Sequence, residues 1–401
     1  MKKKNNLSLV ILAGGEGTRL KKILGNKQKC IAKIDNKPFL DNILNQYSKY
    51  IFNKIYILVG KGSDEVVSLY HGKEFNFTKI ECLVEEKLLG TGGALFKLRN
   101  KVKNFILVNG DSLLDIDINK FLKFNKEFIC KMSLVKNQNY LSNTKLSNLN
   151  LKKNIVTINS SLKKYMNGGV YFFNHKIFKY VKNKKMSLEQ EILPNLIKNK
   201  NVIGQIYKNN FFFDIGTKKN FIKSKKILKN HLSRPAIFMD RDGVINHDYG
   251  YVSNFDNFRF RNGVVKGLDY LIKKKYYLFI ITNQAGIAKN IFSINQFKKL
   301  QIKVKECLAK KNIFIDSVVF CPHHIDGKVK LFTKNCKYRK PQNGMIQKIL
   351  KHWHIDIKKS FFIGDQITDK LCANKSKLKF FYSDKNFYYQ VKKIHTNYIK
   401  K

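Results

Sequence analysis

Hydrophobic residues in the first 230 positions form short continuous runs, and helix-length segments of mixed polarity separate these runs. Buried strands that alternate with helices predict parallel βαβ units in a doubly wound α/β sheet. Ligands of such sheets bind beyond the carboxyl ends of the strands. We expect strands at Leu7–Ala13, Lys54–Val59, Ile80–Leu83, Phe105–Val108 and Gly169–Phe173, and helices at Phe39–Tyr50 and Thr91–Leu98.

The same alternation restarts after a lysine-rich stretch from Phe221 to Ser233 that ends at Arg234-Pro235. We interpret this stretch as a last helix and a linker, and predict two domains, residues 1–230 and 234–401. The second domain is predicted to be another doubly wound parallel sheet. Its expected elements are strands Ala236–Met239, Tyr277–Thr282, Ser317–Phe320 and Phe361–Ile363, and helices Val264–Lys273 and Ser293–Lys310.

The composition of the 401 residues supports folded domains, since 43% are hydrophobic. The formal net charge of +50 would suggest a polyanionic partner, but only seven of the 78 basic residues are arginines. The lysines are spread along the chain with many Asn and Ile, a mixture typical of A/T-rich codons rather than of a nucleic-acid-binding stripe. We therefore expect no nucleic-acid partner, although the charge would attract phosphorylated small substrates.

Seven cysteines without a disulfide-framework spacing indicate a reducing compartment. The apolar run at Leu7–Ala13 follows three lysines, as in a signal peptide, but it is short and leads directly into a glycine-rich turn. No apolar run approaches the roughly 20 residues that span a bilayer. We expect a cytoplasmic protein without membrane contact, and the oligomeric state stays open.

A glycine-rich loop, with Gly14, Gly15 and Gly17, directly follows the first expected strand. Glycines at such a turn let backbone amides approach phosphate groups closely. Thr18 and Arg19 come next, and arginine adds a permanent, fork-shaped cation. The segment predicts a binding site for a nucleoside triphosphate.

The segment from Leu12 to Leu20 closely resembles the sugar-1-phosphate nucleotidyltransferase family. Four later segments resemble the same family in the same order: Leu89–Ala94, Val108–Ser112, Asn167–Tyr171 and Phe213–Thr217. Together the matches cover roughly residues 7 to 230. They imply that a sugar 1-phosphate oxygen attacks the α-phosphorus of the nucleotide while pyrophosphate leaves, a reaction served by positioning and charge neutralisation.

The resemblance also assigns roles. Asp111 and Asp214 would hold Mg²⁺, and Arg19 and Lys29 would grip the phosphates. Further nucleotide contacts would come from Gly14, Gly15, Gly17, Thr18, Gly90, Thr91 and Gly92, and sugar-phosphate contacts from Asn167, Gly168 and Glu189.

The chain departs from this family at two places. Gln28-Lys29-Cys30 stands where the family usually has Pro-Lys-Pro, so the lysine is kept without the prolines that fix φ. The usual Glu-Lys pair before Asn167 is not evident, and Lys163 or Lys164 could take its place.

A second motif, Asp240-Arg241-Asp242-Gly243, follows the expected strand at Ala236–Met239. Two carboxylates at this spacing suit an aspartyl-phosphate mechanism: Asp240 attacks phosphorus, and Asp242 protonates the leaving oxygen and later activates water. The phosphate then needs a hydroxyl and a lysine, and Mg²⁺ needs a further carboxylate. Thr282, Lys340 and Asp365, with Asp369 nearby, complete the four motifs of the haloacid dehalogenase phosphatases, which this half resembles.

The match is closer still to D-glycero-D-manno-heptose 1,7-bisphosphate 7-phosphatases, with histidinol-phosphate phosphatases next. It is carried by residues 246–252, 255–263, 282–288 and 321–324. The resemblance implies Mg²⁺ at Asp240, Asp242 and Asp365, and substrate contacts from Asn283, Gln284 and Arg339.

That phosphatase family carries zinc in a loop of four ligands. Cys321, His323 and Cys336 match three of them, whereas Tyr338 occupies the fourth position. His324 or water could complete a tetrahedron, or else the loop has lost its metal.

Together these resemblances predict a bifunctional enzyme of nucleotide-activated heptose synthesis. The phosphatase would remove the 7-phosphate and leave a 1-phosphate, which the transferase would activate. The N-terminal half most resembles heptose-1-phosphate guanylyltransferases, which favours GTP and the α-anomer; ATP and the β-anomer stay open. The alternatives are a mannose, hexosamine or other sugar substrate, one catalytically decayed half, or, on charge alone, a nucleic-acid-binding protein.

Overall fold

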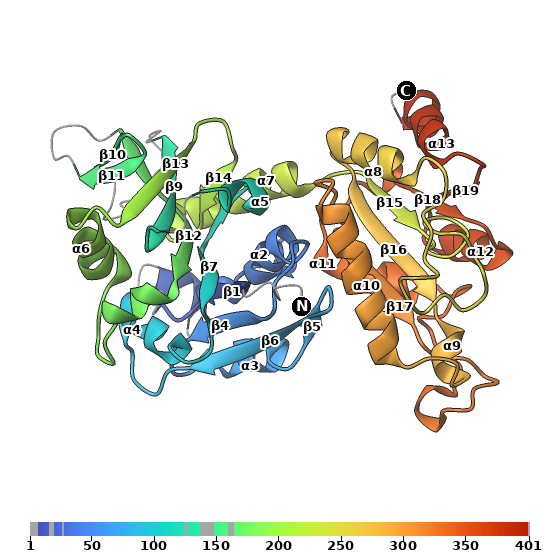
Figure 1. The fold of residues 1–401 in the computed structure, drawn as a ribbon, viewed down its shortest axis with the longest axis horizontal. Coiled ribbons are helices and arrows are strands. Elements are labelled where there is room, and N and C mark those ends of the chain that lie inside the picture. The colour runs from blue at the N-terminus through green and yellow to red at the C-terminus, as the bar shows by residue number, and fades with distance from the viewer. Residues whose placement is uncertain are drawn as a thin grey trace. The chain divides into compact units, whose positions relative to one another are not determined.

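The computed structural model describes residues 7–15, 20–25, 28–124, 127–136, 148–158 and 164–399. The chain divides into two compact units, Met1–Asn230 and His231–Lys401, and their elements are labelled in Figure 1. None of the helices described in the structure has the length and apolarity that crossing a bilayer would require.

The first unit is built on a ten-stranded sheet in the order β10-β11-β13-β9-β12-β7-β1-β4-β6-β5. Strands β7, β1, β4 and β6 are mutually parallel and form the predicted doubly wound part. The ten strands are β1 (Leu7–Leu12), β4 (Ile55–Val59), β5 (Glu74–Phe75), β6 (Thr78–Val84), β7 (Asn104–Asn109), β9 (Cys130–Lys136), β10 (Leu149–Lys152), β11 (Ile155–Ile158), β12 (Tyr165–Asn174) and β13 (Val202–Tyr207).

Strand β12 makes this sheet mixed, because it runs antiparallel to both β7 and β9. All ten of its residues are buried, which fits a central strand covered on both faces. Its aromatic side chains pack in the core, with the rings of Phe105 and Phe173 centred 5.6 Å apart. The sequence predicted only the second half of β12.

Short strands and helices surround this sheet. The helix expected at Thr91–Leu98 is divided into the α-helical turn α4 (Gly90–Gly93) and a 3₁₀ segment, Ala94–Leu98. The remaining strands are β2 (Lys33–Ile34), β3 (Lys37–Pro38), β8 (Ser112–Leu114) and β14 (Phe212–Asp214). The remaining helices are α1 (Lys21–Leu24), α2 (Phe39–Tyr47), α3 (Asp64–Tyr70), α5 (Ile118–Phe121), α6 (Leu193–Lys198) and α7 (Lys218–Leu232).

The second unit has a five-stranded, wholly parallel sheet in the order β17-β16-β15-β18-β19. Its strands are β15 (Ala236–Met239), β16 (Tyr277–Asn283), β17 (Ser317–Cys321), β18 (Phe361–Gly364) and β19 (Lys379–Tyr382). Its helices are α8 (Val264–Lys273), α9 (Ala285–Ala288), α10 (Ile294–Ala309), α11 (Gly344–His352), α12 (Ile367–Lys375) and α13 (Phe387–Ile394).

In each sheet, the order of the strands reverses at one central strand, because the connections on its two sides run in opposite directions. In the first unit β1 lies between β4 and β7, and in the second β15 lies between β16 and β18. A crevice opens at the carboxyl end of a strand with this position. The two phosphate motifs of the sequence follow β1 and β15 directly.

Candidate active sites

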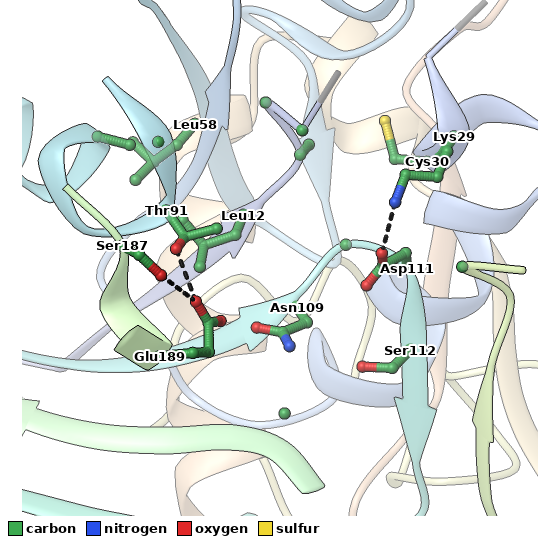
Figure 2. A pocket seen from close by; sticks show the side chains of 18 of the residues that line it. Leu12, Lys29, Cys30, Leu58, Thr91, Asn109, Asp111, Ser112, Ser187 and Glu189 are labelled. Carbon is green, nitrogen blue, oxygen red and sulfur yellow. Dashed lines mark hydrogen bonds and ion pairs between the residues drawn. The ribbon is translucent and has the colours of Figure 1, made fainter. Parts of the chain in front are cut away.

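The first unit contains a cavity of about 730 Å³ at the carboxyl ends of β1, β6 and β7. Gly14 and Gly15 line it after β1, and Gly110 lines it at the end of β7. Asn109 and Asp111 line it from the same end of β7 (Figure 2). A Cβ atom at Gly14 would lie 2.9 Å from the amide nitrogen of Gly60, so only glycine fits there without displacing backbone. Gly17, Thr18 and Arg19 lie outside the described residues.

The two aspartates expected to hold Mg²⁺ come together in this cavity. Asp214, on β14, pairs with Ser112 of β8, and the amide of Ile215 donates to the carbonyl of Asp111 over 2.9 Å. Lys29 Nζ lies 2.9 Å from Asp111 Oδ2 (Figure 2). The site therefore brings two carboxylates and one ammonium group together from three separate segments.

The backbone before Lys29 has a proline-like conformation although no proline is present there. Gln28 has φ −64°, the value that a proline ring would fix. Cys30 is buried, and this burial raises the pKa of its thiol to about 12. The departure at Gln28 and Cys30 therefore leaves Lys29 at the cavity wall. Of the two lysines named as replacements for the Glu-Lys pair, Lys163 is not among the described residues, and Lys164 is exposed beside the ring of Tyr165 and does not line the cavity.

Thr91 and Glu189 join the two sides of the cavity. Thr91 Oγ1 donates to Glu189 Oε2 over 2.7 Å and accepts from the amide of Leu188 over 2.9 Å. Burial raises the pKa of Glu189, and the hydrogen bond from Thr91 opposes that rise. Gly90 has φ +70°, and a Cβ there would lie 2.6 Å from the carbonyl oxygen of Met186. Gly92 is similarly confined.

Asn167 lines the cavity from β12, where the register with β9 shifts. Its Oδ1 accepts from the amide of Gly169 over 2.9 Å, and its amide group bonds the hydroxyl of Tyr171. Gly168 packs against Ser133, with a hypothetical Cβ 2.6 Å from its Oγ, and does not line the cavity.

Sequence analysis missed Glu85, which follows β6 and lines the same cavity. Glu85 is 3% exposed, and its Oε1 atom is buried with no hydrogen-bond partner among the described residues. Burial raises the pKa of Glu85 to about 7, against the lowering effects of the Leu89 amide and Lys97. The sequence did place this acidic residue just after an expected strand, where ligands bind, but only the fold shows that its side chain is buried.

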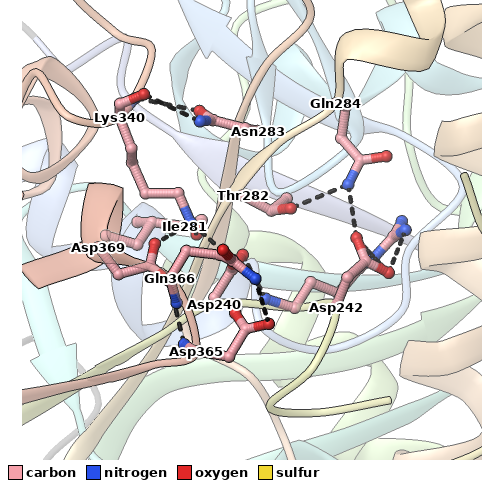
Figure 3. A network of polar contacts seen from close by, with 11 residues as sticks. Asp240, Asp242, Ile281, Thr282, Asn283, Gln284, Lys340, Asp365, Gln366 and Asp369 are labelled. Atoms are coloured by element: carbon pink, nitrogen blue, oxygen red, sulfur yellow. Dashed lines mark hydrogen bonds and ion pairs between the residues drawn. The ribbon is translucent and has the colours of Figure 1, made fainter. Parts of the chain in front are cut away.

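The second site is centred on Asp240, at the carboxyl end of β15 (Figure 3). Lys340 Nζ lies 2.8 Å from Asp240 Oδ2 and 2.6 Å from Asp369 Oδ1, and also donates to the carbonyl of Ile281. Lys340 is 2% and Asp369 0% exposed. Burial raises the pKa of Asp240 to about 7, Lys340 opposes the rise, and Asp369 adds to it.

Asp242 belongs to a separate hydrogen-bond group. Arg241 Nη2 lies 2.7 Å from Asp242 Oδ1, Asn246 Nδ2 donates to the same oxygen, and Gln284 Nε2 donates to Asp242 Oδ2 over 3.0 Å. Gln284 also donates to Thr282 Oγ1 over 2.8 Å. The carboxylate of Asp242 is thus held by Arg241, Asn246 and Gln284, whereas Asp240 pairs with Lys340.

A carboxylate group at this site can hold a cation. Asp240, Asp365 and Asp369 each offer an oxygen within 4.8 Å of the others, whereas the carboxylate of Asp242 points into the other hydrogen-bond group. Asp365 Oδ1 is buried without a hydrogen-bond partner among the described residues. A Cβ at Gly243, which has φ +74°, would lie 2.2 Å from Asp365 Oδ2. Hard cations such as Mg²⁺ prefer oxygen ligands of this kind.

The remaining predicted substrate residues flank Lys340. Asn283 Nδ2 donates to the Lys340 carbonyl over 3.1 Å, and the Lys340 amide donates to Asn283 Oδ1 over 3.0 Å. Asn283 therefore fixes the lysine segment. Arg339 Nη1 donates to the carbonyl of His323 over 3.2 Å.

Cys321, His323 and Cys336 also gather, with ligand atoms within 4.8 Å of one another. Cys321 Sγ lies 3.6 Å from His323 Nδ1, and burial raises the pKa of the Cys321 thiol to about 12. Tyr338 packs against the hydrophobic core. The Nδ1 atom of His324 accepts from the amide of Asp326 over 3.1 Å, and His324 does not join the group.

Two family models match the two units. A nucleotidyl transferase model matches residues 8–137, and a polynucleotide kinase 3 phosphatase model matches residues 237–396. The chain is thus a nucleotidyltransferase fused to a phosphatase of the haloacid dehalogenase type.

Through its phosphatase half, the chain belongs to the D-glycero-beta-D-manno-heptose-1,7-bisphosphate 7-phosphatase family. The member from Photorhabdus laumondii is 41% identical over 144 residues, which are 36% of this chain and 77% of the relative. The Haemophilus influenzae member is also 41% identical over 144 residues, or 78% of its length. Among solved structures, HddC from Yersinia pseudotuberculosis is 24% identical, covers 55% of this chain and 99% of that one, and has a TM-score of 0.46.

Proposed function

We propose that the chain catalyses two consecutive steps in the synthesis of a nucleotide-activated heptose. The C-terminal unit hydrolyses the 7-phosphate of D-glycero-D-manno-heptose 1,7-bisphosphate, and the N-terminal unit transfers a nucleotidyl group to the resulting 1-phosphate. The observation that carries this proposal is the Asp240–Lys340–Asp369 arrangement in a chain of the heptose-bisphosphatase family. The product of the first reaction is the acceptor for the second, which gives the fusion a chemical reason.

In the phosphatase reaction, Asp240 attacks the phosphorus atom and the sugar oxygen leaves with a proton from Asp242. Asp242 then takes a proton from the water that hydrolyses the aspartyl-phosphate. Lys340 and Thr282 hold the phosphate oxygens. Asp240 and Asp365 would hold Mg²⁺, which supplies charge neutralisation at the phosphate; the orphaned Oδ1 of Asp365 supports that assignment.

In the transferase reaction, the sugar phosphate oxygen attacks the α-phosphorus, and pyrophosphate leaves without a covalent enzyme intermediate. Lys29 neutralises phosphate charge from the cavity wall, and Asn167 and Glu189 orient the sugar. Asp111 and Asp214 would hold Mg²⁺, which supplies further neutralisation of the triphosphate. The adjacent positions of these two aspartates support this role.

Glu85 supports GTP as the nucleotide. An ionised carboxylate only accepts hydrogen bonds. Guanine presents two adjacent donors, N1–H and the 2-amino group, whereas adenine presents an acceptor beside its amino group. A buried carboxylate with an unsatisfied oxygen therefore favours guanine, because guanine can donate to both carboxylate oxygens, whereas adenine presents only its amino group and leaves one oxygen unpaired.

We also propose Zn²⁺ at Cys321, His323 and Cys336, with the fourth position left to water. The gathered sulfur and nitrogen donors fit the preferences of zinc. Metal analysis of the purified chain, before and after the substitution Cys336→Ala, tests this assignment; metal content that does not depend on Cys336 would disprove it. The seven free cysteines fit a reducing, cytoplasmic setting.

One experiment tests the combined function. The purified chain is given heptose 1,7-bisphosphate with Mg²⁺ and each nucleoside triphosphate in turn, and the products are identified by mass. We expect phosphate release and a GDP-heptose with GTP. Phosphate release without any nucleotide sugar would favour a decayed transferase or another sugar. Hydrolysis of 3′-phosphorylated DNA in preference to the heptose would favour the polynucleotide substrate named by the family model.

A further inference from the structure

Arg241 is a buried residue of the phosphatase site to which the mechanism above gives no role. It stands between Asp240 and Asp242 in the chain, and only 1% of it is exposed. We propose that Arg241 is a positioning residue, which occupies one oxygen of the Asp242 carboxylate so that Asp242 exchanges its proton through the other oxygen. This inference rests on the proposed phosphatase function and identifies what orients its acid–base group.

The two carboxylate oxygens of Asp242 have different partners. Oδ1 accepts from Arg241 Nη2 over 2.7 Å, from Arg241 Nε over 3.1 Å and from Asn246 Nδ2 over 2.9 Å. Oδ2 accepts from Arg241 Nε over 3.1 Å and from Gln284 Nε2 over 3.0 Å. Oδ1 therefore receives the shorter and more numerous hydrogen bonds, two of them from one guanidinium group.

These partners decide which oxygen can carry a proton. Arginine has five N–H donors and no acceptor, and its guanidinium stays charged. A protonated Oδ1 would therefore set its own O–H against the guanidinium donors. Gln284 differs, because a carboxamide has an acceptor as well as donors, and its Nε2 also donates to Thr282 Oγ1 over 2.8 Å. The proton of Asp242 therefore belongs at Oδ2, on the side of the hydroxyl proposed to hold the phosphate.

The support of the Asp242 carboxylate is itself fixed by other segments. The guanidinium also donates from Nη2 to the carbonyl of Val252 over 2.8 Å, and its carbon lies 5.4 Å from the centre of the Phe297 ring on α10. Asn246 is fully buried, and its Nδ2 donates to the carbonyl of the next residue over 2.8 Å. The side chain of Asp242, in contrast, is 21% exposed. The carboxylate is thus open to a substrate while the groups that orient it are buried.

This orientation matters most when the leaving oxygen needs a proton. As Asp240 bonds to phosphorus, the bond from phosphorus to the sugar oxygen breaks, and that oxygen takes the proton of Asp242. A sugar alkoxide leaves slowly without this proton, whereas nitrophenolate leaves readily as the anion. Loss of the positioning residue should therefore slow sugar phosphates selectively, whereas a general packing defect would slow both kinds of substrate.

The test compares kcat/KM for heptose 1,7-bisphosphate with kcat/KM for p-nitrophenyl phosphate, because this parameter reports the steps up to the aspartyl-phosphate. We expect Arg241→Gln to lower the value for the bisphosphate about 10²-fold and the value for the aryl phosphate at most about threefold. Arg241→Lys keeps the charge but cannot form the fork, so we expect a loss of about tenfold for the bisphosphate alone.

The matched controls are Arg234→Gln and Arg234→Lys. Arg234 precedes β15, at the opposite end of this strand from Asp240, and its guanidinium carbon also lies 5.4 Å from an aromatic ring centre, that of Tyr277. Both controls should keep the wild-type values for the two substrates. They separate the position of Arg241 from the general effect of replacing an arginine that contacts an aromatic ring.

Equal losses for the two substrates in Arg241→Lys, or no loss for either, would overturn the inference. Circular dichroism checks the folding of each variant. If Arg241→Gln does not fold, the result rests on Arg241→Lys and on Asn246→Ala, which should give the same selective loss to a smaller degree.

Failure of the underlying function looks different, because the wild-type chain would then hydrolyse p-nitrophenyl phosphate but not the heptose bisphosphate. Phenyl phosphate, which has a poorer leaving group, takes the place of the sugar in that case. Arg241→Lys should slow phenyl phosphate more than p-nitrophenyl phosphate, and equal slowing would again count against the role of Arg241.

Discussion

The two active sites solve phosphate chemistry in opposite ways. In the phosphatase unit, Lys340 lies between two buried carboxylates, 2.8 Å from Asp240 and 2.6 Å from Asp369. In the transferase cavity, Glu85 is buried and its Oε1 has no hydrogen-bond partner among the described residues, while Asp111 forms an ion pair with the partly exposed Lys29. The central charges of the phosphatase site are thus paired within the protein, whereas the transferase cavity leaves an oxygen of Glu85 without a partner among the described residues.

The strongest way to separate the two sites is Asp240→Asn. This change removes the proposed nucleophile but keeps the size of the side chain. We expect phosphate release to fall by at least about 10³-fold, while nucleotidyl transfer to a supplied heptose 1-phosphate is unchanged. Loss of both activities in a folded protein would contradict two independent sites. The readouts are a phosphate assay and a pyrophosphate assay on the same sample.

The reciprocal change is Asp111→Ala. It removes one of the two aspartates proposed to hold Mg²⁺ and the partner of Lys29. We expect pyrophosphate release to fall about 10²- to 10³-fold because neutralisation of the triphosphate is weakened, and phosphate release to stay at the wild-type rate. As a control, Asp64→Ala removes an exposed aspartate at the start of α3 and should affect neither activity.

Because Lys340 is buried between Asp240 and Asp369, its removal should destabilise the second unit. Replacing Lys340 by Met keeps the length of the side chain and leaves Asp240 and Asp369 buried without their cation. We expect the free energy of unfolding of the second unit to fall by about 3–5 kcal/mol in metal-free buffer. Urea unfolding followed by the fluorescence of Trp353, the single tryptophan of the chain, measures it. The double change Lys340→Met with Asp369→Asn should recover part of the loss; no recovery would mean that Asp369 carries no unpaired charge in the single variant.

In the transferase cavity, the buried carboxylate of Glu85 should affect the selectivity for GTP over ATP. Glu85→Gln replaces one acceptor oxygen by a donor, which can no longer accept from both guanine donors. We expect the preference for GTP over ATP in kcat/KM to fall about tenfold to a hundredfold. Glu86→Gln, at the neighbouring exposed residue, is the control and should keep the preference. An unaltered GTP preference in Glu85→Gln would remove this residue from base recognition.

The sequence predicted correctly those strands and helices whose hydrophobic pattern is regular and whose ends are marked by turn residues. The bounds of β15 and α8 are those predicted, because an apolar run and an amphipathic helix are local properties. Strand β9 was missed, since Lys131 and Lys136 interrupt its apolar pattern. Lys131 is buried nonetheless, with its ammonium 5.0 Å from the ring centres of both Phe121 and Phe124.

The site residues were likewise predicted only where a local sequence motif identifies them. Motif spacing named Asp240, Asp242, Lys340 and Asp365, with Asp369 nearby. It did not show that Asp369 is fully buried and paired with Lys340. A role that depends on burial and on an unpaired atom arises only when distant segments pack together. Chemistry-bearing motifs are therefore predictable from sequence, and the charge balance around them is not.

The buried carboxyl of Glu85 also predicts that the selectivity for GTP over ATP depends on pH. Burial raises the pKa of Glu85 to about 7. Below that pH the carboxyl is protonated and cannot accept two hydrogen bonds; above it, the carboxylate can. The ratio of the KM for GTP to the KM for ATP should therefore fall about tenfold as the pH rises from 6 to 8, because one ionisation with a pKa near 7 is completed over that interval. Taking the ratio cancels the titration of the triphosphate itself. In Glu85→Gln the ratio should be flat with pH; a slope that persists in this variant would assign the ionisation to another group.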